Sequence, residues 1–363
     1  MALQFILGPS GAGKSEYIYE DIIRRTMQDE RENVIVLVPE QYSLEIQRKL
    51  VQKHPRGGSF QIDVIGFNRL AYRIFDELHI KPKKVLEDFG KSMLLRKAAQ
   101  EHKEELSLYA GSLDKAGFID EAKSLMSEIY QYDIPRERLR EALQKLDDSE
   151  EARVLARKLQ DMLVIFDAFE EKKGQSFIVA EQMLELLTAA AEQSELIAGS
   201  EIVLDGFTGF TPIQLNLISV LLRRAKKVTI VLTIDAATYE KKHVAEHELF
   251  ALTKQTIEHL LLTAEQAHVV VEPALFLGKD GCKRWSKGHP LAHLEQNLFR
   301  YPYRVGKDEE QAITITAYDT PAQELTGVAE QIRTLVMEQG YRYRDNAIVS
   351  GNLEETAEFA KRI

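Results

Sequence analysis

Cysteine is nearly absent from this sequence: Cys282 is the single one among 363 residues. One cysteine excludes an internal disulfide and any metal or iron–sulfur site built from several cysteines within this stretch. Low cysteine content is typical of proteins from a reducing compartment. We therefore expect a cytoplasmic protein.

Long apolar runs are also missing. No stretch approaches the about 18 consecutive apolar residues that cross a membrane, so we expect no membrane span. The first residues, Met1–Phe5, include no basic segment before the apolar run, and we predict no signal peptide.

Basic residues are outnumbered by acidic ones, 47 to 57, which gives a net charge of −10. This balance argues against a protein that coats nucleic acid, although a local basic groove remains compatible with it. The 44% hydrophobic and 29% charged residues are typical of a soluble globular protein. At about 100–200 residues per domain, the length predicts two or three domains.

Short apolar runs alternate with amphipathic stretches near both ends of residues 1–285. Continuous apolar runs of this length are typical of parallel strands that are covered on both faces of a sheet. The predicted strands are Leu3–Leu7, Val34–Val38, Phe60–Ile65, Ile202–Leu204, Val228–Ile234 and a short one at Val269–Val271.

From about Val85 to Ala198 helical periodicity dominates, and no convincing strand is predicted. We expect a helical insertion over residues 81–200 that divides one α/β domain into residues 1–80 and 201–285. The predicted helices of the insertion include Phe89–His102, Ile119–Tyr132 and Ala152–Lys173.

Residues 286–363 resemble a linker followed by the start of a second α/β domain. Helices are predicted at Pro290–Phe299 and Pro321–Gln339, and strands at Ile313–Ala317 and Ala347–Val349. Two parallel strands do not form a stable sheet alone, so we expect the chain to be the front part of a longer polypeptide.

A phosphate-binding motif follows the first predicted strand and opens a predicted helix. The residues Gly8-Pro9-Ser10-Gly11-Ala12-Gly13-Lys14-Ser15 match G-x-x-x-x-G-K-S/T in full. The glycines let the backbone wrap around phosphate oxygens, and the helix N-terminus favours an anion. Lys14 is predicted to reach the β- and γ-phosphates of ATP, and Ser15 to bind Mg²⁺.

A candidate for the second Mg²⁺ ligand is Asp205, which follows a predicted strand. This segment resembles the second motif of the UvrD/Rep/RecB superfamily of DNA helicases, with Phe207 and Gln214 also in register. Gly206 stands where that family has its water-activating glutamate, and Ala236 stands at the position of its γ-phosphate sensor. A general base is worth about 10²–10⁴ in rate, so we expect slow or absent hydrolysis and assign no catalytic residue.

The whole chain resembles the AddB family, whose members pair with AddA in helicase–nucleases that process broken DNA ends. The Asp-Gly-Phe…Phe-Thr-Pro pattern is the most specific, because it is the degenerate helicase motif expected of that family. The resemblance rests on the phosphate loop, Val36–Gln41, Phe67–Ala71, Leu204–Phe207 with Phe210–Pro212, and Gly340–Asp345.

This resemblance implies a P-loop RecA-like fold of the superfamily 1 helicase type, with the beginning of a second RecA-like domain after residue 285. It implies an AddA partner that acts as the motor, and substrates that are double-stranded DNA ends and single strands scanned for Chi. The nuclease and its 4Fe-4S cluster would lie outside this stretch. This part would bind nucleotide and serve as a DNA- and AddA-binding scaffold for recombination.

An alternative function is a self-contained, active P-loop enzyme, either a helicase or a small-molecule kinase. The intact phosphate loop motivates this alternative, whereas Gly206 and Ala236 count against it. Robust ATP turnover by this chain, abolished by Lys14→Ala, would favour it.

Candidate DNA contacts are Gln41, Phe67 and Arg69. The helicase resemblance places the segment of Gln41 near single-stranded DNA, although a plain strand-to-helix loop is an equal alternative. Phe67 could stack on a base and Arg69 could contact a phosphate, but such a phenylalanine is more often a core residue. Trp285, beside basic residues, either grips a strand or anchors its loop.

Overall fold

The structure is a computed structural model, and the chain divides into two compact units, residues 1–287 and 288–363. No helix in the described part of the chain is long and apolar enough to cross a bilayer. The structure describes residues 1–29, 31–81, 83–115, 117–147, 149–174, 176–278, 282–286, 288–307, 311–351, 356–357 and 360–361.

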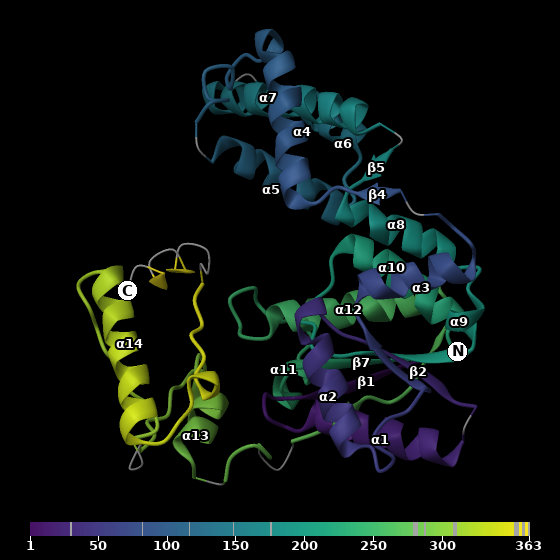
Figure 1. The fold of residues 1–363 in the computed structure, drawn as a ribbon, viewed down its shortest axis with the longest axis vertical. Helices are drawn as coiled ribbons and strands as arrows, with labels where there is room; N and C mark the ends of the chain where they lie inside the picture. The colour runs from purple at the N-terminus through teal and green to yellow at the C-terminus, as the bar shows by residue number, and fades with distance from the viewer. Residues whose placement is uncertain are drawn as a thin grey trace. The chain divides into compact units, whose positions relative to one another are not determined.

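Among the described residues, seven strands form a parallel sheet in the larger unit (Figure 1). Their order is β3-β2-β6-β7-β1-β8, and β9 also pairs with β1. β7 therefore lies between β1, which leads into the phosphate-binding motif, and β6, which leads into Asp205. The strands are β1 (Ala2–Gly8), β2 (Asn33–Leu37), β3 (Ile62–Ile65), β6 (Ser200–Leu204), β7 (Lys227–Thr233), β8 (Val270–Val271) and β9 (Leu275–Phe276).

Helices cover both faces of this sheet (Figure 1), and the predicted parallel α/β arrangement is confirmed. Because side chains alternate along a strand, Ile6 and Val36 pack toward α1 and α2, whereas Leu7 and Leu37 pack toward α3, α8, α10 and α12. This two-sided burial explains the continuous apolar runs. The helices are α1 (Lys14–Gln28), α2 (Ser43–Lys53), α3 (Phe67–Glu77), α8 (Ala180–Ala191), α10 (Pro212–Arg224) and α12 (Ala251–Gln266).

A helical part with its own hydrophobic core lies between α3 and α8 in the chain. Leu95, Phe166 and Phe169 are fully or almost fully buried in that core. The expectation that this part holds no strand is wrong, because β4 (Lys84–Val85) pairs in parallel with β5 (Phe177–Ile178) where the chain enters and leaves it. The helices are α4 (Asp88–Glu101), α5 (Phe118–Gln131), α6 (Arg136–Gln144) and α7 (Glu150–Lys173).

The smaller unit contains the two predicted helices, as α13 (Pro290–Asn297) and α14 (Pro321–Glu338). The predicted strands Ile313–Ala317 and Ala347–Val349 are wrong, because the structure assigns no strand to either segment. Ile315 and Val349 are 93% and 94% exposed. Alternating apolar residues form a stable strand only where a sheet buries them, and these segments have no such cover in the described residues.

Candidate functional site

The phosphate loop is the turn between β1 and α1. Gly11 and Gly13 adopt φ values of 72° and 83°, in the left-handed region that glycine enters without a steric penalty. Gly13 is the N-cap residue of α1, and no side chain caps the helix. The first amides of α1 therefore have no acceptor in their own helix and are suited to bind an anion.

Lys14 places a positive charge inside this loop. Its ammonium group donates to the carbonyl oxygens of Gly8 and Pro9, both at 2.9 Å. The residue is only 9% exposed. A phosphate bound at the amides of α1 would meet this charge at close range, as the motif requires.

Asp205 lies at the carboxyl end of β6, where its main-chain N–H donates to the carbonyl oxygen of Leu37 at 3.0 Å. Its side chain accepts a hydrogen bond from the hydroxyl of Tyr19, with 2.6 Å between Oη and Oδ2. Tyr19 comes one turn after Ser15 on α1. Asp205 is therefore brought to the same helix face as Ser15, although their strands are not neighbours.

Tyr19 is a site residue that the sequence-based reasoning missed. Burial, together with the neighbouring Asp205 carboxylate, holds the pKa of Tyr19 well above its ordinary value. The hydroxyl therefore stays protonated and able to donate. The signal that could have identified it is its spacing of four residues from Ser15 on the helix that follows the phosphate loop.

Ser15 and Asp205 offer the oxygen ligands that Mg²⁺ prefers. Among the described residues, no group of three or more His, Cys, Asp and Glu side chains is placed to hold a metal ion. Mg²⁺ bound with a nucleotide does not need such a group, because phosphates and waters supply most of its ligands. The residues present therefore fit a magnesium–nucleotide complex.

The segment after Asp205 departs from the helicase pattern in its backbone as well as its side chains. Gly206 has a φ of 83°, and a Cβ there would lie 3.4 Å from the Pro39 ring. Gln214, which matched the helicase pattern, accepts the N–H of Thr211 at 3.0 Å and thereby caps α10. Ala236 is simply the first residue of α11 (Ala236–Glu240).

Residues 282–286, called here the covering segment, lie against the phosphate loop. The main-chain N–H groups of Lys283 and Arg284 donate to the carbonyl oxygen of Gly11 at 3.1 and 3.2 Å. The thiol of Cys282 donates to the carbonyl oxygen of Ser10 at 3.5 Å. These contacts use carbonyl oxygens, so they leave the amide side of the loop to an anion.

Trp285 anchors the covering segment. It is half-buried, and one of its ring carbons lies 3.5 Å from where a Cβ of Gly11 would be. The Arg284 guanidinium carbon lies 5.8 Å from the centre of the indole ring. The anchoring interpretation of Trp285 therefore has a structural basis, and a contact with a nucleic-acid strand stays a prediction.

The three candidate DNA contacts lie on different elements. Gln41 is exposed in the short helix η1 (Glu40–Tyr42), and Arg69 is exposed on α3. Phe67 is half-buried, with its ring centre 5.5 Å from that of Phe207. The structure does not test DNA contact at any of them.

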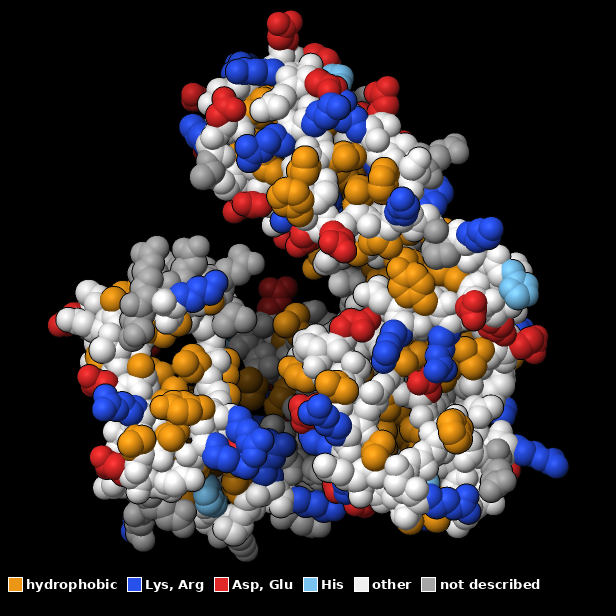
Figure 2. Space-filling model, viewed as in Figure 1, with side chains coloured by type: hydrophobic (Ala, Val, Ile, Leu, Met, Phe, Trp, Pro, Cys, Tyr) orange, Lys and Arg blue, Asp and Glu red, His pale blue; other side chains and the backbone are white. Residues whose placement is uncertain are grey.

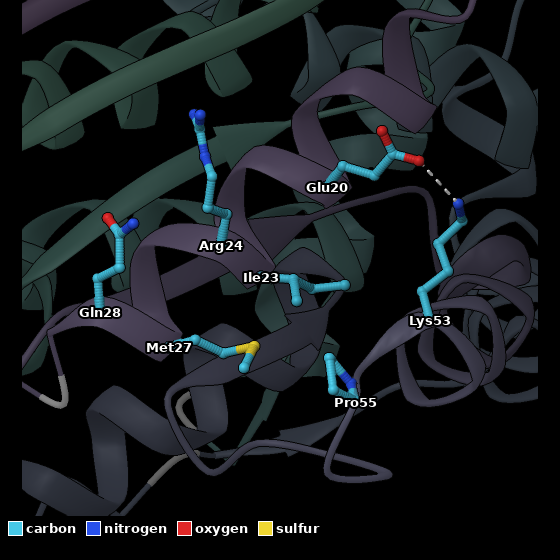
Figure 3. A pocket seen from close by; sticks show the side chains of 7 residues that line it. All are labelled: Glu20, Ile23, Arg24, Met27, Gln28, Lys53 and Pro55. Carbon is cyan, nitrogen blue, oxygen red and sulfur yellow. Dashed lines mark hydrogen bonds and ion pairs between the residues drawn. The ribbon is translucent and has the colours of Figure 1, made fainter.

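The charged surface does not form one broad basic field on the face that Figure 2 shows, where acidic and basic side chains are interspersed on the larger unit. A pocket of about 550 Å³ opens beside the C-terminal half of α1, and an ion pair between Glu20 and Lys53 crosses one end of it (Figure 3). The phosphate loop contributes no residue to this pocket. It is lined by Glu20, Ile23, Arg24, Met27, Gln28, Lys53 and Pro55.

A family model described as "ADDB, N-terminal" matches residues 5–295. Three curated relatives are each named as the B-type subunit of an ATP-dependent helicase/deoxyribonuclease. The one from Lachnoclostridium phytofermentans is 38% identical over 366 residues, which cover 100% of this chain and 32% of the relative. Those from Clostridium novyi and Alkaliphilus metalliredigens are 30% and 32% identical, with 100% of this chain and 31% of each relative covered. The chain thus spans about a third of the length of these relatives.

Proposed function

Since the chain belongs to the AddB N-terminal family, we propose that it is the nucleotide-binding, helicase-like part of the AddB subunit of an ATP-dependent helicase/deoxyribonuclease. In this proposal residues 1–80 and 201–285 form a RecA-like domain of the superfamily 1 type. Residues 81–200 are its helical insertion, and residues 286–363 begin the second RecA-like domain. The full-length subunit acts on DNA ends in the cytoplasm.

The observation that carries the proposal is the phosphate loop with an uncapped helix N-terminus and a buried lysine. The amides at the start of α1 bind the phosphates, and Lys14 balances their charge. Ser15 and Asp205 hold Mg²⁺, which would neutralise phosphate charge when bound. Lys283 and Arg284 add positive charge beside Gly11, and their contacts with the loop support this role.

Nucleotide binding without fast hydrolysis suits a subunit that is not the motor. Gly206 and Ala236 offer no carboxylate or amide to activate or orient water. In this proposal AddA drives unwinding, and this part binds AddA and the DNA strand that is scanned for Chi. Gln41, Phe67 and Arg69 are the proposed DNA contacts. The nuclease and the 4Fe-4S cluster belong to the rest of the AddB subunit.

The test is a calorimetric titration of the chain with ATP and Mg²⁺, together with an assay of phosphate release on the same samples. We expect binding without appreciable release, and loss of binding in Lys14→Ala. Melting curves establish that this variant remains folded. Release that depends on Lys14 would instead support the self-contained enzyme, and a chain that binds no ATP would contradict the proposed nucleotide site.

A further inference from the structure

The hydrogen bond between Tyr19 and Asp205 joins two segments 186 residues apart in the chain. Both side chains are almost completely buried, at 3% and 4% exposure. Hydrogen bonds to a charged acceptor are shorter than those between neutral groups and roughly twice as strong. The bond is therefore strong enough to fix the rotamer of the carboxylate.

The position of Tyr19 relates this bond to the nucleotide site. Ser15 and Tyr19 are four residues apart on α1 and so lie on one face of the helix. The hydroxyl of Tyr19 occupies Oδ2 of Asp205, which leaves Oδ1 as the oxygen that can serve an ion. Mg²⁺ accepts little deviation from octahedral geometry, so the orientation of an oxygen ligand affects its affinity strongly.

We propose that Tyr19 is a positioning residue of the magnesium–nucleotide site, where its hydroxyl holds the Asp205 carboxylate in the orientation that supports Mg²⁺. This inference rests on the proposed nucleotide binding. It separates the function of the hydroxyl from that of the ring, because the ring packs in the hydrophobic cluster between α1, α2 and the sheet. A phenylalanine at this position keeps the packing and removes the orienting bond.

The helical part offers a matched control. Tyr130 of α5 donates its hydroxyl to Glu170 of α7, and burial raises its pKa, as it does for Tyr19. Neither residue belongs to the phosphate loop or to the strands that lead to it. Tyr130→Phe therefore removes the same kind of hydrogen bond, at a comparable cost in stability, without touching the proposed site.

The experiment measures ATP binding to the full chain by calorimetry over a series of Mg²⁺ concentrations, and in EDTA. In Tyr19→Phe we expect the Mg²⁺ concentration for half-maximal ATP binding to rise about tenfold or more, as for other residues that orient metal ligands. The affinity in EDTA stays at the wild-type value. Tyr130→Phe keeps the wild-type Mg²⁺ dependence.

A second pair of variants tests whether Tyr19 acts through Asp205. Asp205→Asn already weakens the Mg²⁺ dependence, so adding Tyr19→Phe should change it no further. An unchanged Mg²⁺ dependence in Tyr19→Phe, an equal change in Tyr130→Phe, or a further change in the double variant overturns the inference alone. A wild-type chain that binds no ATP overturns the proposed function and this inference together.

Discussion

Two loops at the carboxyl edge of the same sheet differ in what they retain of a nucleotide-hydrolysing site. The phosphate loop matches its motif at every defined position, and its glycines adopt the conformations that the motif needs. The loop after β6 keeps Asp205 but has Gly206, in a left-handed conformation, where a helicase has glutamate. Phosphate binding and water activation depend on separate loops, so one can be present without the other.

The largest effect should come from separating the two loops by mutation. Lys14→Ala removes a charge that contacts two phosphates, and at about 1.5–3 kcal/mol for such contacts we expect a loss of ATP affinity of about 100-fold, with or without Mg²⁺. Asp205→Ala should weaken binding about tenfold, and only when Mg²⁺ is present. Calorimetry in Mg²⁺ and in EDTA measures both. An equal loss for Asp205→Ala in EDTA would contradict the division between the loops.

Restoring the missing carboxylate should not restore hydrolysis. In Gly206→Glu the new side chain must adopt a left-handed conformation, which costs about 1–2 kcal/mol in the free energy of unfolding. Denaturant titration measures that loss, and a phosphate-release assay should show no gain. Thr208→Glu, at an exposed position two residues on, is the matched control and should cost less. Fast ATP turnover by Gly206→Glu would mean that a single side chain separates this protein from an active enzyme.

The smallest effect should come from the covering segment, which distinguishes the phosphate loop from its neighbour. Lys283→Ala and Arg284→Ala remove exposed charges, and at about 0.5–1 kcal/mol each we expect ATP affinity to fall two- to fivefold. Salt should reduce this difference, because exposed charges are screened. Lys226→Ala is the control, since this exposed lysine lies at the amino end of β7, at the opposite edge of the sheet. Equal losses for all three variants would indicate a general effect of net charge.

Local patterns were sufficient to predict the strands of the larger sheet, because two-sided burial demands continuous apolar runs such as Val34–Val38. The same patterns failed at Ile313–Ala317, since an apolar alternation becomes a strand only where other chain segments cover it. The pair β4 and β5 was missed because two residues are too short for any periodicity to register.

At the site, the residues Gly8–Ser15 could be identified from the sequence alone, because the turn, the helix N-terminus and the lysine are all encoded within one short stretch. The contacts of Tyr19 with Asp205 and of Cys282 with Ser10 join residues 186 and 272 positions apart. Only the order of the strands and the packing of α1 against them bring these groups together. The tertiary structure therefore decides how Asp205 is held and what lies against the phosphate loop, since no local interaction encodes either contact.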